Sequence, residues 1–119
     1  MSSKKIELEI FTKTYDFMLW MFNHTNKFPK SSRFSVAVRI ENMLLDFLET
    51  IMNANRLRNK IDKLKEADKI LEFTRILIRI SKDMKFLGLS SYEFASRSLN
   101  EIGRLLGGWL RQQKSVTDG

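Results

Sequence analysis

The sequence predicts an all-α protein, an antiparallel up-and-down four-helix bundle. Apolar residues recur at intervals of three and four through most of the chain, which is the periodicity of helices with one buried face. A single proline and five glycines leave little room for a sheet with many turns. At 119 residues we expect one domain, residues 1–119, that buries roughly two-thirds of its unfolded surface. Four amphipathic helices with brief loops in such a chain indicate a bundle.

The first helix is predicted over about residues 5–26. One face is apolar, and further apolar residues widen it, so this helix is expected to contact more than one neighbour. The first set is Ile6, Ile10, Phe17, Trp20 and Met21, and the second is Phe11, Tyr15, Met18 and Phe22.

A turn at Phe28-Pro29-Lys30 is expected to end this helix, because proline disfavours helical geometry in the residue before it. Ser31 or Ser32 is expected to cap the second helix through its hydroxyl. Phe28 and Phe34 flank the turn, and the sequence predicts that they clamp it.

The second and third helices are predicted over about 32–55 and 58–86. The second has an apolar face of Val36 or Ala37, Ile40, Leu44, Phe47 and Ile51. The third has a face of Ile61, Leu64, Ala67, Leu71, Leu77, Ile80 and Met84. Gly88 is expected to end the third helix in the left-handed conformation.

The fourth helix is predicted over about 91–113, with Ser90 and Glu93 as a capping box and residues 114–119 as a polar tail. Its apolar seam is continuous: Tyr92, Ala95, Leu99, Ile102, Leu106 and Trp109. Each internal glycine costs a helix about 1 kcal/mol relative to alanine. We therefore expect Gly103, Gly107 and Gly108, with Trp109, to serve close packing, either within the bundle or between subunits.

The charge balance favours a polyanionic partner. Lysine and arginine number 21 against 14 acids, which gives a net charge of +7. Three clusters of cations stand out: Arg75, Arg79 and Lys82 on one face of the third helix, Lys27, Lys30 and Arg33 around the Phe-Pro turn, and Arg97, Arg104 and Arg111 in a row at seven-residue intervals on the fourth helix. Such surfaces bind phosphates through counterion release and carry little sequence information.

Few residues with catalytic chemistry are present. The chain has no cysteine and one histidine, His24, so nucleophile triads, the common zinc sites and a di-iron site lack their ligands. We expect no catalytic residue, metal or cofactor, although Glu41 and Asp46 could still act as a paired general acid and base.

Glu93, Arg97, Glu101 and Arg104 are expected to form a salt-bridge ladder. No apolar run approaches the ~20 residues of a membrane span, and we expect a cytoplasmic protein.

Several of these motifs resemble the accessory variability determinant (Avd) family of diversity-generating retroelements, from about Tyr15 to Arg111. The resemblance is strongest in the segment 28–34, at Arg75 with Arg79, in Tyr92-Glu93-Phe94-Ala95, and in the run from Ile102 to Trp109 with its Gly-Arg and Gly-Gly-Trp. A more distant similarity runs to the four-helix proteins encoded by intervening sequences in 23S rRNA genes, which share the Phe-Pro turn.

The resemblance implies a non-catalytic four-helix bundle that assembles into a homopentameric barrel with a basic surface. Such a protein binds the reverse transcriptase of its element together with RNA or DNA, and it supports mutagenic cDNA synthesis. Carried over to this chain, Arg75 and Arg79 match basic positions of the family and are the first candidates for the binding surface.

Three other interpretations stay open. The chain could be a standalone nucleic-acid-binding bundle of the 23S rRNA intervening-sequence type, which a neighbouring reverse transcriptase gene would argue against. It could be an enzyme, which would require activity to depend on Glu41 or Asp46. Binding to a membrane surface through a basic amphipathic helix is less favoured, because the apolar faces are needed for the core.

Overall fold

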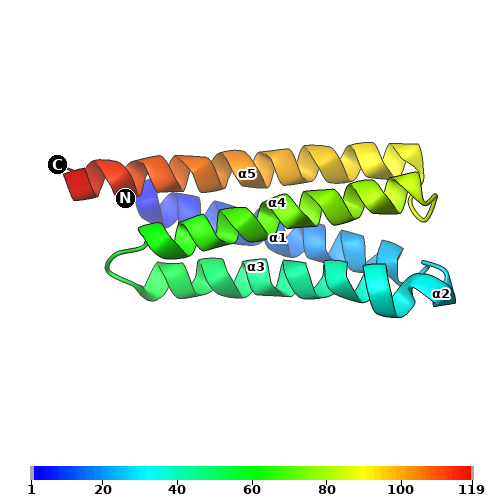
Figure 1. The fold of residues 1–119 in the computed structure, drawn as a ribbon. Helices are drawn as coiled ribbons and strands as arrows, with labels where there is room; N and C mark the ends of the chain where they lie inside the picture. Colours follow the sequence, from blue (N-terminus) through cyan, green and yellow to red (C-terminus); the bar gives the residue numbers. More distant parts are fainter. Residues whose placement is uncertain (1, 119) are drawn as a thin grey trace.

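The computed structural model describes residues 2–118 as a four-helix bundle, as the sequence predicts (Figure 1). The long helices are α1 (Ser2–Thr25), α3 (Val38–Arg56), α4 (Ile61–Asp83) and α5 (Leu89–Asp118). Between α1 and α3 lie a short helix, α2 (Lys30–Ser32), and a π-helical turn, η1 (Arg33–Ala37). The part of the chain that the structure describes contains no strand.

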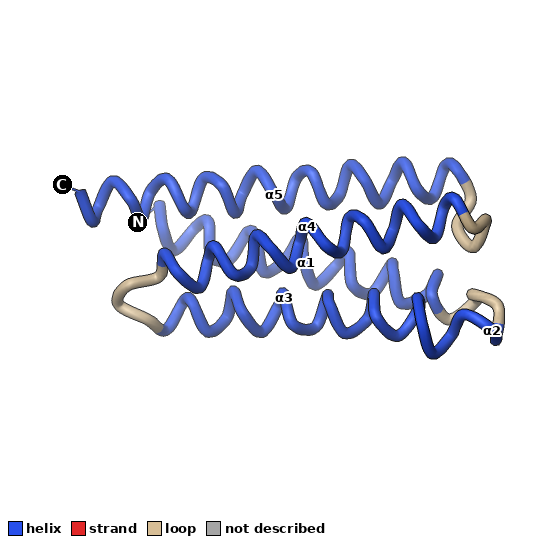
Figure 2. The backbone as a smooth tube through the Cα atoms, in the orientation of Figure 1, coloured by secondary structure: helices blue, strands red, loops and turns tan. Residues whose placement is uncertain are grey.

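The four long helices form a square in which each contacts two neighbours. Helix α1 packs against α3 and α5, and α4 packs against the same two, so α1 and α4 lie on one diagonal. The bundle measures 50 × 24 × 19 Å. The start of α1 and the end of α5 lie at the same end of it (Figure 1). The α1–α3 and α4–α5 connections lie together at the opposite end (Figure 2).

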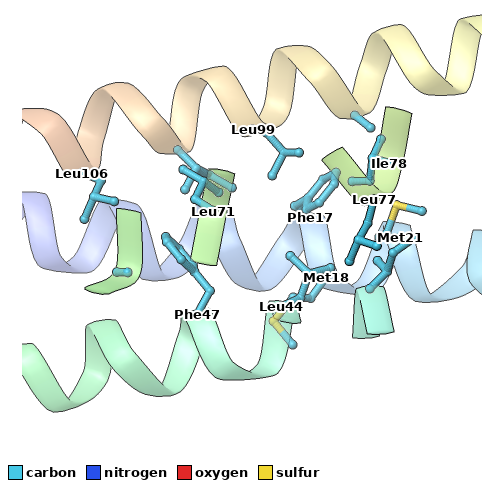
Figure 3. Packing of buried hydrophobic residues seen from close by; sticks show 14 of the residues in the cluster. Phe17, Met18, Met21, Leu44, Phe47, Leu71, Leu77, Ile78, Leu99 and Leu106 are labelled. Carbon is cyan, nitrogen blue, oxygen red and sulfur yellow. The ribbon is translucent and has the colours of Figure 1, made fainter. Parts of the chain in front are cut away.

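The core runs along the bundle axis and draws on all four long helices (Figure 3). The predicted seam of the last helix is confirmed, since Ala95, Leu99, Ile102, Leu106 and Trp109 are at most 1% exposed. Its first residue, Tyr92, is partly buried and packs against the core. The predicted face of α3 is also buried. In α1 the buried apolar residues are Ile10, Phe17, Met18 and Met21.

The predicted face of α4 is confirmed at Leu64, Ala67, Leu71 and Leu77 but is wrong at Ile80 and Met84. Ile80 and Met84 are exposed, and the buried positions are instead Thr74, Ile78 and Ser81. The hydroxyl of Thr74 donates to the Ile70 carbonyl at 2.8 Å, and that of Ser81 donates to the Leu77 carbonyl. Because these hydroxyls are satisfied inside their own helix, they can enter the core without a large desolvation cost.

Helix α4 ends earlier than predicted, in a turn that does not use Gly88. Lys85 has a φ of 66° and takes the left-handed position, and no glycine has a positive φ among the described residues. The Phe86 amide donates to the Ser81 carbonyl and the Lys85 amide to the Lys82 carbonyl, both at 2.9 Å. This pair of bonds is a Schellman motif. At the other end, α4 begins at Ile61, whose amide donates to the Asn59 side chain.

The predictions for the Phe-Pro turn are wrong in two respects. Neither Ser31 nor Ser32 caps a helix through its hydroxyl. Helix α2 begins at Lys30 after Pro29, and Ser32, at the N-cap position of η1, makes no side-chain cap bond. The Phe28–Phe34 clamp is absent. Phe28 packs against Phe86, with ring centroids 5.5 Å apart, whereas Phe34 is 87% exposed.

The predictions for the start and the end of α5 are also wrong. It begins at Leu89, so the predicted capping box lies inside the helix, and the residues from 114 to 118 continue the helix instead of forming a tail.

Candidate nucleic-acid interface

Arg75 joins two helices of the bundle. Its guanidinium donates to the Asn100 side chain and, at 3.2 Å, to the Leu99 carbonyl, both on α5. The same group lies over Gly103, where a Cβ would come within 2.7 Å of Nη2. The predicted close contact at Gly103 is therefore with a side chain from α4. Only 31% of the Arg75 side chain is exposed, so part of its hydrogen-bonding capacity serves the fold.

Arg79 and Lys82 lie near Arg75 on α4 but differ in their surroundings. The Arg79 side chain is 69% exposed, and its only ion-pair partner in the described chain is Asp83, at 3.9 Å. Lys82 lies over the Tyr92 ring, 4.9 Å from its centroid, and also pairs with Asp83. Arg75, Arg79 and Tyr92 line a groove of about 290 Å³ between α4 and α5.

The arginine row of α5 faces solvent, and the predicted salt-bridge ladder is absent there. Glu101 pairs with Lys13 of α1 at 3.2 Å. Arg97 and Arg104 have no ion-pair partner among the side chains that the structure describes, and they line a shallow depression beside Phe94, which is 41% exposed. These two cations are accessible to a partner.

At Gly107 and Gly108 an added Cβ would meet no other helix within 4 Å among the described residues. The nearest atom to an added Cβ at Gly107 is Nη1 of Arg111 at 3.5 Å, and at Gly108 it is Nη2 of Arg111 at 3.8 Å. Both are ordinary contacts with a side chain of the same helix. Trp109, in contrast, is 1% exposed and belongs to the core.

The excess positive charge is concentrated in the connections between helices. All 14 acids lie on the four long helices, together with 15 of the 21 basic residues, so the long helices are nearly neutral. The other six cations lie in the connections: Lys27, Lys30, Arg33, Arg58, Lys60 and Lys85.

Four of these six cations gather at one end of the bundle, where Phe28 contacts Phe86. We call Lys27, Lys30, Arg33 and Lys85 the basic end. Residues 26–40 and 84–92 contain no acid. At the opposite end, Lys60 donates to the carbonyls of Asn55 and Leu57 and so serves α3.

The predicted cluster at the Phe-Pro turn is thus brought together, and Lys85 joins it. Sequence reasoning missed Lys85 as a member. The absence of acids from both connections is the signal that could have found it.

Glu41 and Asp46, on which the enzyme interpretation depends, do not form a pair. Glu41 accepts a hydrogen bond from the buried Thr25 hydroxyl at 2.6 Å, whereas Asp46 is exposed. Five residues along one helix place them about 140° apart around its axis. The His24 ring packs against Trp20 at a tilt of 32°, with centroids 4.0 Å apart, and its Nδ1 lies 2.9 Å from the Trp20 carbonyl. This histidine therefore holds the end of α1.

No group of three or more potential metal ligands occurs among the described side chains. None of the helices described is long and apolar enough to cross a membrane.

Two exposed apolar stripes run along the sides of the bundle. One lies on α1 and the other on the C-terminal half of α4, each with members three or four residues apart. The α1 stripe is Leu8, Phe11, Tyr15 and Leu19, and the α4 stripe is Phe73, Ile76 and Ile80 with Met84, the C-cap residue of the helix. Their members are between 37% and 68% exposed. A mostly apolar cleft of about 400 Å³ adjoins the first stripe and is lined by Leu8, Phe11 and Met52.

Comparison with known proteins identifies the family. The family described as bAvd-like matches residues 8–113. The chain belongs to the bAvd-like family. Membership makes it an Avd-like protein and indicates an accessory protein of a retroelement, a type that is not catalytic. No curated protein and no solved structure matches the chain.

Proposed function

We propose that this Avd-like protein binds the reverse transcriptase and the template RNA or cDNA of a diversity-generating retroelement, and thereby supports mutagenic cDNA synthesis. The observation that carries the proposal is the family match over residues 8–113, which spans all four helices. The basic end supplies a surface of the charge that phosphates require. A polymerase that copies RNA needs its template held close by, and a basic accessory subunit can hold it.

Different basic residues suit different roles in this proposal. Arg79, Arg97 and Arg104 have accessible side chains and are candidate contacts for the polymerase or the nucleic acid. Arg75 is a weaker candidate for a direct contact, because its donors are directed to α5.

We also propose that the protein acts as a ring of identical subunits. The α1 and α4 stripes lie on diagonally opposite helices, so one stripe of a subunit can meet the other stripe of the next. Such a contact is heterologous, and it closes into a ring when the rotation between subunits permits. Contiguous exposed apolar side chains, such as those of the two stripes, are typical of protein interfaces. The number five comes from the resemblance to Avd proteins.

Co-purification tests the function. The protein would be expressed with a tagged reverse transcriptase encoded beside it, and the captured complex treated with nuclease before washing. We expect the two proteins to stay together. Loss of the complex only after nuclease would show that nucleic acid is the bridge, and would favour a standalone nucleic-acid-binding bundle. Arg79→Glu with Arg97→Glu should weaken capture without changing the helical content, because both side chains are exposed.

A further inference from the structure

Phe34 is the most exposed large apolar side chain in the part of the chain described, at 87%. It lies in η1, where the Val38 amide donates to the Arg33 carbonyl five residues earlier. In a regular α-helix, a residue three positions before the buried Ala37 would share its face. The π turn instead places Ser32, which is 8% exposed, on the buried side with Ala37 and leaves Phe34 in solvent. Such turns are rare and occur frequently at functional sites.

The surroundings of Phe34 are cationic. Lys30 and Arg33 lie within four residues of it, and the contact between Phe28 and Phe86 brings Lys85 to the same end. Lys27, Lys30 and Lys85 have no ion-pair partner within the described residues, and the Arg33 guanidinium makes one long bond, of 3.4 Å, to the Asn26 carbonyl. Two of the nearest acids along the chain are engaged, Glu41 by Thr25 and Asp83 by Arg79 and Lys82.

An exposed aromatic ring among unpaired cations matches the two chemical features of a single nucleic-acid strand. Bases stack on aromatic rings whatever their sequence, and phosphates attract the surrounding cations. A duplex offers only the second feature, since its bases already stack on one another. A protein partner would have to be acidic around an apolar contact, whereas a single strand meets both requirements at every nucleotide.

We propose that the basic end binds single-stranded nucleic acid, with one base stacked on Phe34 and the neighbouring phosphates bound by Lys27, Lys30, Arg33 and Lys85. This rests on the proposed nucleic-acid function and adds the strand type and the stacking residue. The base contact gives the site a preference for unpaired segments, and the backbone contacts leave it tolerant of sequence.

The test compares three labelled RNA probes of equal length by fluorescence anisotropy: a single strand without self-complementarity, the same strand with abasic nucleotides, and a duplex. Phe34→Ala should weaken binding of the intact strand about tenfold. The same variant should leave the affinities for the abasic strand and the duplex unchanged, because neither presents a free base to the ring. Phe34→Trp should retain the affinity of the native protein for the intact strand. Because Phe34 is exposed, the melting temperature of both variants should match that of the native protein.

Lys30→Glu serves as the charge control and should weaken binding of all three probes. For the intact strand, the plot of log affinity against log salt concentration should have a slope of about −3 when four phosphates are contacted. Replacement of one lysine of the basic end by alanine should reduce that slope by about 0.7.

The outcomes separate the two proposals. Suppose that Phe34→Ala lowers the affinity for none of the probes, or for all of them equally, while Lys30→Glu lowers it for all three. The stacking proposal is then wrong, and binding through the phosphate backbone stands. If the native protein binds none of the probes at low salt, the nucleic-acid function itself is wrong. If Phe34→Ala disrupts only the nuclease-resistant complex with reverse transcriptase, Phe34 is a protein contact and the stacking proposal is overturned.

Discussion

Arg75 and Arg79 are both exposed enough to meet a partner, yet only Arg75 is bonded to another helix. Loss of its charged hydrogen bonds to α5 should lower the free energy of unfolding by about 1 kcal/mol in Arg75→Ala. Arg79→Ala should change it by less than about 0.5 kcal/mol, because the pair with Asp83 is exposed. Urea denaturation of the two variants checks this difference. Equal effects would mean that the contact with α5 contributes nothing to stability.

Gly103 should show its role only in combination with Arg75. An alanine there gains about 1 kcal/mol of helix propensity, but its Cβ displaces the Arg75 guanidinium. We expect Gly103→Ala to be nearly neutral in the native chain and stabilising by about 1 kcal/mol in the Arg75→Ala background. A double-mutant cycle measures this coupling. Additive effects would show that the two residues act independently.

At the scale of the element, the Schellman turn after α4 holds a lysine where glycine is usual. The left-handed conformation costs a residue with a Cβ roughly 1 kcal/mol or more. Lys85→Gly should therefore raise the melting temperature by about 4 °C. The same change removes a cation of the basic end and should weaken RNA binding severalfold.

Lys85→Arg is the matched control for this turn, since it keeps both the charge and the side chain. It should change neither the melting temperature nor the affinity. A melting temperature of Lys85→Gly no higher than that of the native protein would argue against strain at this position.

Helix α5 offers a second test at this scale. An added Cβ at Gly107 or Gly108 meets only the side chain of Arg111, at ordinary contact distances. Each Gly→Ala change should stabilise an isolated subunit by about 0.5 to 1 kcal/mol. Denaturation of a variant that does not assemble, such as Tyr15→Glu below, measures this directly. Lower stability would reveal a close contact of these glycines within the chain.

Sequence periodicity predicts the helices well because burial of an apolar face dominates their packing. The seam of α5 and the face of α3 follow directly from their spacing. The prediction fails in α4, where hydrophobicity favours Ile80 and Met84 over Thr74 and Ser81. Hydroxyl groups bonded to their own helix can be buried, and an exposed apolar side chain can serve an interface. Neither possibility is visible in a single helical pattern.

The candidate site was only partly predictable for a related reason. The cluster of Lys27, Lys30 and Arg33 is local in sequence and was found. Lys85 lies more than 50 residues away and joins it only through the contact of Phe28 with Phe86. The exposure of Phe34 depends on the π turn, which shifts the helical register by one residue. No pattern of α-helical spacing could have revealed that shift.

At the scale of the whole molecule, the apolar stripes and the basic end are separate surfaces. The apolar stripes lie along α1 and α4, on the sides of the bundle. The basic end belongs to the α1–α3 and α4–α5 connections, which form one tip (Figure 2). In a cyclic assembly all equivalent tips lie at the same height along the symmetry axis. A ring joined through the sides would therefore present every Phe34 on one rim. A single strand could then contact several subunits in turn, which raises its overall affinity above that of one site.

The ring interface can be tested by blocking one stripe at a time. Tyr15→Glu places a charge in the α1 stripe, and Ile80→Glu places one in the α4 stripe. Because each contact needs one stripe of each kind, each variant alone should be monomeric by native mass spectrometry. An equimolar mixture should form a one-to-one dimer, since the intact α4 stripe of Tyr15→Glu can meet the intact α1 stripe of Ile80→Glu. If either variant alone formed dimers, the contact would join like stripes and a ring of this kind would be excluded. Arg104→Glu, at an exposed position on α5, which carries neither stripe, controls for added negative charge and should leave the assembly of the native protein intact.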